Sequence, residues 1–164
     1  MIRKCNEGDC FVICSIINEA AQVYKEVIPE DRWHEPYMPI DELKREIDDG
    51  VEFWGDEEAE DLIGVMGLQD RGDVYLIRHA YVRIARQKRG IGTKLLHHLE
   101  KMTDKPILIG TWADATRAVQ FYQKNGYHLL SRPETERLLK RYWRIPERQV
   151  VTSLVLANPR WEGE

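Results

Sequence analysis

The sequence predicts an α/β fold in which one β-sheet carries helices on both faces. The first half contains strand-like runs at 51–54, 62–68 and 74–82, where apolar residues alternate or run continuously. The second half alternates helical spacing, which begins after residue 90, with a strand-like run at 107–112. Strands followed by alternating helices and strands are typical of a single sheet covered by helices.

Length and composition favour one domain over residues 1–164. A chain of 164 residues lies in the usual single-domain range and is long enough to bury a core. A hydrophobic content of 43% with 32% charged residues is typical of a globular protein rather than a disordered one. The net charge of −4 argues against general nucleic-acid binding, which calls for a basic surface. Without a long apolar run or a signal-peptide pattern, we expect no membrane association and a cytoplasmic location.

The N-terminal segment predicts a short strand and two helices. Residues 2–4 read as a strand, and helical spacing of apolar residues predicts a helix from residue 8 to about residue 25. A loop with three prolines follows, and residues 40–50 predict a second helix that ends near Gly50. Cys10 and Cys14 share one face of the first helix, and we interpret them as core residues. Because no histidine lies nearby at zinc-finger spacing, no metal is predicted.

The remaining elements follow in order along the chain. The runs 51–54 and 62–68 predict a hairpin around the acidic turn 55–61, and 74–82 predicts the next strand. Apolar residues from Ile91 onward predict a helix. The later elements are expected at 107–112 (strand), 115–125 (helix), 134–143 (an extra helix) and 149–156 (strand).

The segment 86–93 is the part most informative about function. It reads Arg-Gln-Lys-Arg-Gly-Ile-Gly-Thr, and its glycines remove Cβ atoms that would block close approach of a phosphate to the backbone. It precedes a predicted helix, whose N-terminal N–H groups and dipole favour an anion. The glycine spacing excludes both a P-loop and a dinucleotide fingerprint. A plain loop with a solvated basic cluster is the alternative.

A second motif, Ala-Val-Gln-Phe-Tyr-Gln-Lys-Asn-Gly-Tyr, occupies residues 118–127. Together with Gln87-x-x-Gly90-x-Gly92 after a strand that ends in Tyr81-Val82, it resembles the GNAT superfamily of acyl-CoA-dependent N-acetyltransferases. The resemblance is close over 74–130 and looser over the whole chain. It implies a mixed, mostly antiparallel central sheet with a V-shaped splay between the fourth and fifth strands.

The resemblance implies acetyl-CoA as co-substrate and no metal. The backbone at Tyr81 and Val82 would hold the thioester carbonyl and pair with the pantetheine arm. Tyr122 matches the family tyrosine beside the sulfur and is the predicted general acid; a packing aromatic is the alternative. The residues expected to bind the cofactor are Tyr81, Val82, Gln87, Lys88, Arg89, Gly90, Ile91, Gly92, Thr93, Ala115 and Tyr122.

The general base is left open. Counting from the family's two usual glutamate positions leads to Leu76 and Gly110, neither of which ionises. His79 is a candidate base, because histidine exchanges protons near neutral pH, although a packed or surface histidine is the alternative. Asp114 is expected to cap the next helix rather than to act as a base. A water chain to bulk solvent is a further alternative.

For the acceptor, the loop residues Trp33, His34, Glu35 and Tyr37 are candidate contacts, with a proline-stiffened surface loop as the alternative. The extra helix at 134–143 is expected to pack on the sheet, cover the acceptor or form a dimer seam. The predicted function is acetyl transfer from acetyl-CoA to a primary amine, of a small molecule or peptide, in a ternary complex. A non-catalytic acyl-CoA sensor or partner-binding module is the alternative. The sequence leaves open the identity of the amine, the acyl-chain preference and the formation of a homodimer.

Overall fold

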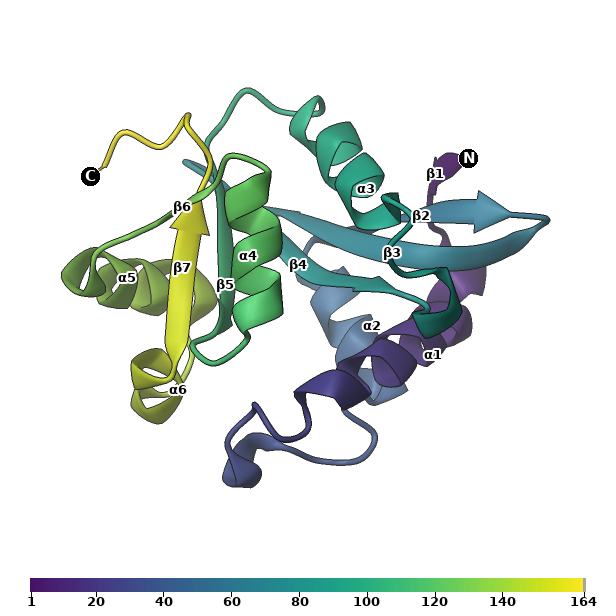
Figure 1. Ribbon diagram of the computed structural model, residues 1–164, viewed down its shortest axis with the longest axis horizontal. Helices are drawn as coiled ribbons and strands as arrows, with labels where there is room; N and C mark the ends of the chain where they lie inside the picture. The colour runs from purple at the N-terminus through teal and green to yellow at the C-terminus, as the bar shows by residue number, and fades with distance from the viewer. Residues whose placement is uncertain (164) are drawn as a thin grey trace.

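A computed structural model describes residues 1–163 and places seven strands in one mixed sheet with the order β1-β2-β3-β4-β5-β7-β6 (Figure 1). Neighbouring strands pair antiparallel except β4 and β5, which are parallel. This arrangement confirms the mixed, mostly antiparallel sheet. The strands are β1 Ile2–Lys4, β2 Val51–Glu58, β3 Asp61–Asp70, β4 Tyr75–Val82, β5 Ile107–Trp112, β6 His128–Leu129 and β7 Ser153–Ala157.

Helices cover both faces of this sheet. Successive residues of β4 lie in different apolar clusters, Leu76 with α5 and Ile77 with α3, because side chains alternate along a strand. Helices α3 and α4 pack on one face, whereas α1 and α2 pack on the other face of β2 to β4, beside α5. The helices are α1 Cys10–Ala21, α2 Ile40–Asp48, α3 Ile91–Glu100, α4 Thr116–Lys124, α5 Arg132–Leu138 and α6 Glu147–Val151, with a π-helical turn at Leu139–Trp143.

Strands β4 and β5 pair over one short stretch and then separate. Their register joins residues 75–77 to residues 107–109 and goes no further. In β4 the register against β3 shifts between Val65 and Gly67, so His79 and Ala80 form a bulge, and His79 has a φ of 53°. A bulge bends its strand and increases the local twist. In Figure 1, β5 runs nearly vertically while β4 runs across the view, which is the expected splay.

Two predicted segments differ from the structure. Residues 55–58, three of which are acidic, continue β2 instead of forming a turn, and the turn is confined to Ala59 and Glu60. Pairing with β3 satisfies their backbone, while Lys94 neutralises the buried Asp56 at 2.7 Å. Near the C-terminus, residues 147–151 form α6, and the last strand begins only at Ser153, where its pairing with β5 starts. The local apolar pattern did not separate these two elements.

Other boundaries shift because of local capping and packing. The first helix ends at Ala21 and continues as a 3₁₀ turn over Gln22–Tyr24. The extra helix begins at Arg132, where the Ser131 hydroxyl accepts a hydrogen bond from the Glu134 N–H at 3.3 Å. The two-residue strand β6 was not expected from the sequence.

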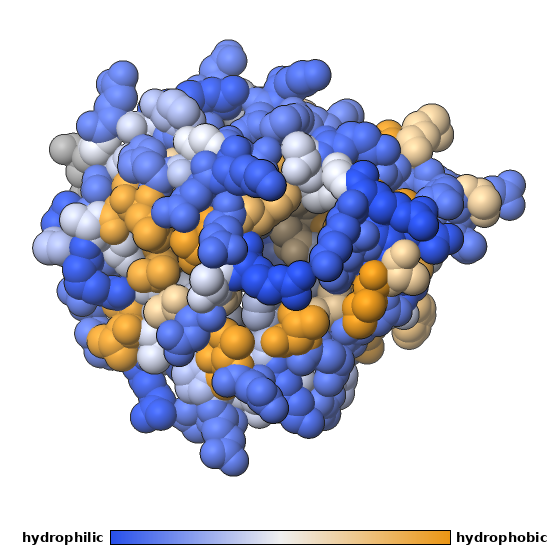
Figure 2. Space-filling view, in the orientation of Figure 1, coloured by the Kyte–Doolittle hydropathy of each residue, from blue (hydrophilic) through white to orange (hydrophobic). Residues whose placement is uncertain are grey.

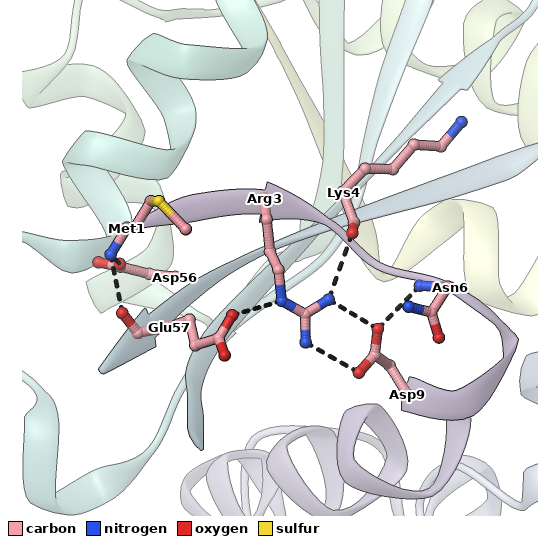
Figure 3. A network of polar contacts seen from close by, with 7 residues as sticks. All are labelled: Met1, Arg3, Lys4, Asn6, Asp9, Asp56 and Glu57. Carbon is pink, nitrogen blue, oxygen red and sulfur yellow. Dashed lines mark hydrogen bonds and ion pairs between the residues drawn. The ribbon is translucent and has the colours of Figure 1, made fainter. Parts of the chain in front are cut away.

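A polar network joins β1 to the start of the first helix (Figure 3). The Arg3 guanidinium donates to Glu57 at 2.5 Å and to both carboxylate oxygens of Asp9 at 2.8 and 3.0 Å. The Asn6 N–H also donates to Asp9, at 2.8 Å. These bonds hold the pKa of the Asp9 carboxyl below its usual range, with the Arg3 bond as the largest cause.

Cys10 and Cys14 are buried in the cluster beneath α1, as expected for core residues. Within residues 1–163, no group of three or more His, Cys, Asp and Glu side chains is placed to hold a metal ion. None of the helices in this range combines the length and apolar character needed to cross a membrane.

Candidate functional site

The splay between β4 and β5 opens into a cleft of about 410 Å³, which we call the splay cleft. Its walls come from the end of β4 and the turn after it, the middle of β3, the end of α1 with the turn that follows it, the N-terminal end of α3, and α4 with the residues just before it. On the face shown in Figure 2, the surface is hollowed near its centre, between hydrophilic and apolar residues. The lining includes Ala80, Tyr81, Val82, Gln87, Lys88, Gly92, Ala115, Phe121 and Tyr122.

The turn before α3 presents unpaired backbone donors. The first bonded amide at this end is that of Lys94, which donates to the Gly90 carbonyl at 3.0 Å. In the described part of the chain, the N–H groups of residues 88–93 have no intramolecular acceptor. The Gln87 side chain fixes the preceding backbone by donating to the Val82 carbonyl at 3.0 Å. A helix N-terminus with free amides and a neighbouring Lys88 suits a phosphate.

The two glycines of this turn have different structural roles. Gly90 has a φ of 77°, and an added Cβ would meet nothing within 4 Å, so the backbone conformation requires this glycine. An added Cβ at Gly92 would lie 3.3 Å from the Phe121 ring. Gly92 therefore permits close contact between α3 and α4. The expectation that the glycines allow close approach of a phosphate stays a prediction.

Most of the residues predicted to bind the cofactor line the splay cleft. The four that do not are Arg89, Gly90, Ile91 and Thr93. The Ile91 side chain is buried against the sheet, so residue 91 offers its amide but not its side chain. Asp114 also lines the cleft, but the N-cap of α4 is Ala115, so the expected capping by the Asp114 side chain was wrong.

A second cavity of about 190 Å³ adjoins the splay cleft, and we call it the aromatic cavity. The two cavities share Tyr24, Ala80, Tyr81, Ala118 and Tyr122 as lining residues. Tyr122 is 6% exposed. Burial raises the pKa of its phenol above the ordinary value, so the hydroxyl stays protonated at neutral pH. The structure thus places a proton donor at the boundary between the cavities.

His79 lines the aromatic cavity and contacts a carboxylate that the sequence did not reveal. Its Nε2 lies 2.7 Å from Oε1 of Glu46, on α2. Burial opposes ionisation of Glu46, but the bonds from His79 and Arg78 outweigh it and hold the pKa of Glu46 below its usual value. An ionised carboxylate only accepts hydrogen bonds, so His79 Nε2 carries the proton. In the neutral ring, Nδ1 is then the proton acceptor.

The second partner of Glu46 is Arg78, which donates to it at 2.9 Å and to Gln69 at 3.0 Å. Glu46 and His79 are separated by 33 residues in sequence. No local pattern links them, because only the packing of α2 against the β4 bulge brings them together.

The loop over residues 33–37, which we call the acceptor loop, reaches a cavity at one position. Tyr37 lines the aromatic cavity, whereas Trp33, His34 and Glu35 line neither cavity in the described structure. The Trp33 indole donates to Glu35 at 3.1 Å, and the Trp33 ring stacks on Tyr37 with centroids 5.4 Å apart. His34 Nδ1 lies 2.8 Å from the Pro36 carbonyl oxygen. These three residues support Tyr37 rather than facing the cavity.

Comparison with known proteins identifies the family. The family model for the acetyltransferase (GNAT) domain matches residues 17–140. The chain belongs to the GNAT acetyltransferase family. No curated protein matches the sequence significantly.

Solved structures with the GNAT fold superpose over nearly the whole chain. The PaiA N-acetyltransferase of Thermoplasma acidophilum in complex with coenzyme A is similar with a TM-score of 0.73 and 18% identity, over 96% of this chain and 97% of that one. A GNAT-family acetyltransferase of Staphylococcus aureus gives 0.69 and 18%, over 98% and 99%. A ribosomal-protein-alanine N-acetyltransferase of Brucella melitensis gives 0.66 and 15%, over 96% and 98%. At these identities the likeness shows the fold.

GNAT acetyltransferases use acetyl-CoA as acyl donor, and the residues of this chain fit such a molecule. Free amides stand at one end of the splay cleft, and the unpaired end of β4 lines its wall.

The two usual positions of the family base are filled by apolar packing in this GNAT chain. Leu76 is fully buried against α5, and an added Cβ at Gly110 would lie 3.0 Å from the Trp143 ring. An acidic side chain at either position would therefore need the surrounding structure to rearrange.

Proposed function

We propose that this chain transfers the acetyl group of acetyl-CoA to a primary amine by direct attack in a ternary complex. The observation that carries the proposal is that two adjoining cavities meet at Tyr122. One cavity has free helix-terminal amides for a diphosphate, and the other has His79 for an amine. The two reactants would therefore approach each other from opposite sides of one buried phenol.

Binding of the donor rests on backbone groups. The amides of residues 88–93, assisted by Lys88, would bind the diphosphate. Beyond Ile77 the edge of β4 has no partner strand, so its backbone is free to pair with the pantetheine amides. The main-chain N–H groups near Tyr81 and Val82 would then polarise the thioester carbonyl.

Two side chains would transfer protons, His79 as acceptor and Tyr122 as donor. Nδ1 of His79 would accept a proton from the amine, while Glu46 holds the ring through Nε2. A C–N bond forms as the C–S bond breaks, and Tyr122 would donate its proton to the leaving sulfur. The phenol would regain a proton from solvent, and His79 would release one.

A direct test combines calorimetry of acetyl-CoA with an assay of thiol release. Tyr122→Phe should lower kcat while leaving acetyl-CoA affinity nearly unchanged. Tyr127→Phe is the matched control, because Tyr127 is equally buried but donates to Glu100 at 3.0 Å, outside both cavities. Absence of acetyl-CoA binding at millimolar concentration would refute the proposal. Unchanged turnover of Tyr122→Phe would refute the acid role.

The role of His79 needs a substitution that respects its backbone. His79 has a φ of 53°, a conformation that asparagine tolerates better than alanine. His79→Asn should lower kcat while leaving acetyl-CoA affinity nearly unchanged, whereas Glu46→Gln should keep the fold and lower kcat less. An unchanged kcat in His79→Asn would show that another group or solvent takes the proton.

A non-catalytic acyl-CoA sensor is the second candidate. The apolar packing at Leu76 and Gly110, where family members carry acids, favours it. Binding of acetyl-CoA without thiol release across a broad amine panel would support the sensor and exclude the enzyme.

A further inference from the structure

The aromatic cavity concentrates aromatic side chains from separate parts of the fold. The chain has five tryptophans and seven tyrosines, and six of these twelve residues line this one small cavity. They come from the turn after α1, the acceptor loop, β4, β5, α4 and the π-helical turn. The six are Tyr24, Tyr37, Tyr81, Trp112, Tyr122 and Trp143.

The polar groups of several of these residues lie beside one another. Burial raises the pKa of the Tyr37 phenol, and the polar groups of Tyr81 and Trp112 beside it partly oppose that rise. At one edge of the cavity, the Ser153 hydroxyl donates to the Gln149 carbonyl at 2.7 Å. These contacts help to hold the rings of Tyr37, Tyr81 and Trp112 in place. The six aromatic side chains offer a ligand the faces and edges of their rings, and the Tyr122 hydroxyl is available as a donor where the two cavities adjoin.

The charges around the cavity argue against a polycationic acceptor. Neither Asp nor Glu lines the aromatic cavity within the described residues. The cation in its lining, Arg78, is already bonded to Glu46 and Gln69. A polyamine or an aminoglycoside carries several ammonium groups, each of which needs a carboxylate or comparable partner when it leaves water. The cavity offers none for the additional charges.

The volume of the cavity limits the part of an acceptor that it can enclose. Its volume of about 190 Å³ is below the roughly 300 Å³ at which pockets for drug-sized ligands begin. Apolar cavities of about 150 Å³ hold one benzene molecule. The aromatic cavity therefore fits a single ring with a short chain.

The wall formed by Trp143 depends on a local feature of this chain. A π-helical turn over Leu139–Trp143 ends at Arg144, whose φ is 53°, and it places the indole against β5. Gly110 makes room for it, since an added Cβ would lie 3.0 to 3.2 Å from three atoms of the indole. Single-turn π-helices occur frequently at functional sites. Here the turn supplies an aromatic wall at a position where a family member can carry its base.

We propose that the acceptor is a small arylalkylamine, a primary amine on a short chain that ends in one aromatic ring. The inference rests on the proposed acetyl transfer and names its substrate class. The ring lies among the aromatic side chains, and the amine points toward His79 and Tyr122, where the two cavities meet. Contacts between aromatic rings then orient the amine. Such a substrate has no second ammonium group that would need a charged partner.

The test compares amines of matched length in the thiol-release assay. Phenethylamine and tryptamine are the probes, with hexylamine as the apolar control and spermidine and kanamycin as polycationic controls. The aromatic amines should exceed hexylamine in kcat/KM by about two- to tenfold, the range expected for aromatic pairing beyond area burial. Their kcat/KM should exceed that of spermidine and kanamycin by a larger factor. Preference for spermidine, kanamycin or a peptide N-terminus would overturn the proposal.

Substitutions locate the preference. Trp143→Leu should abolish the advantage of phenethylamine over hexylamine, whereas Trp54→Leu is the matched control, because Trp54 packs against His98 and lines neither cavity. If Trp143→Leu does not fold, Trp143→Phe should keep the preference and Trp112→Leu should reduce it. An advantage that survives both Trp143→Leu and Trp112→Leu would refute the aromatic cavity as its source.

Failure of this proposal differs from failure of the proposed function. Calorimetry of phenethylamine against the protein saturated with coenzyme A measures occupancy of the cavity without chemistry. Binding of phenethylamine that Trp143→Leu abolishes, in a protein that releases no thiol with any amine, would support the ligand class and refute the transferase. Thiol release with spermidine, in the absence of phenethylamine binding, would support the transferase and refute the ligand class.

Discussion

The contact between Gly110 and Trp143 allows a quantitative test of how the aromatic cavity is built. In Gly110→Ala the new methyl group would lie 3.0, 3.1 and 3.2 Å from Cε2, Cζ2 and Nε1 of the indole. Carbon atoms pack optimally at about 3.5 to 4.0 Å, so the ring has to move by roughly 0.5 Å or more. Overpacking of this kind costs about 1 to 3 kcal/mol.

For a domain of 164 residues, each kcal/mol lowers Tm by about 2 to 4 °C. Gly110→Ala should therefore lower Tm by about 2 to 12 °C, measured by thermal unfolding followed by circular dichroism. Because the Trp143 ring lines the aromatic cavity, the same variant should also lower kcat/KM for the accepted amine.

A double-mutant cycle isolates this contact. In a Trp143→Leu background the ring that blocks the methyl group is absent, so Gly110→Ala should cost less than about 0.5 kcal/mol, which leaves a coupling energy of about 0.5 to 3 kcal/mol. An equal loss of unfolding free energy on Gly110→Ala in both backgrounds would refute the reasoning. A Gly110→Ala protein as stable as the parent would also refute it.

Three further predictions concern stability. Arg3 lowers the pKa of Asp9 in the folded protein, so the stability that Asp9 contributes is present above the ordinary pKa of about 4 and is lost as pH falls through the folded pKa. Asp9→Asn should therefore flatten the dependence of the unfolding free energy on pH in that window. An unchanged slope would contradict this. Leu95→Ala, at a fully buried position, should cost about 2 to 5 kcal/mol in urea unfolding, whereas the control Met102→Ala, at a position 41% exposed, should cost far less. Gly90→Ala at a φ of 77° should cost about 1 to 2 kcal/mol and weaken acetyl-CoA binding, with Gly90→Asn milder in both; an equal effect of Ala and Asn would argue against the backbone explanation.

The elements that the sequence predicted well are those whose signals are local. Helix α3 and its N-terminal turn follow from glycines, basic residues and apolar residues at helical spacing within about fifteen positions. Strand β5 follows from an apolar run opened by Pro106. The segment 149–156 was assigned to one strand because the β-branched residues Val150, Val151 and Thr152 run without a break into β7, and so short a run carries no periodicity that separates the two elements.

The acceptor side of the site shows the opposite case. Trp33, His34 and Glu35 were reasonable candidates by composition, yet their side chains bond within the loop, and Tyr37 is the loop residue that lines the cavity. The sequence did not reveal Glu46 as a site residue, because a glutamate on an amphipathic helix is common. Its contact with His79, 33 residues later in the chain, forms only through the bulge in β4.

The sequence by itself determined the family resemblance and the glycine turn before α3, since closely spaced residues encode both, and the mixed sheet was expected through that resemblance. Only the tertiary structure decided what lines the aromatic cavity, because its aromatic wall is assembled from six segments that meet through packing. The reason is physical: hydrogen bonding and helix periodicity act between near neighbours in the chain. A cavity wall, in contrast, depends on how distant helices and strands pack, and here a glycine on β5 and a π-helical turn decided that an indole occupies this wall.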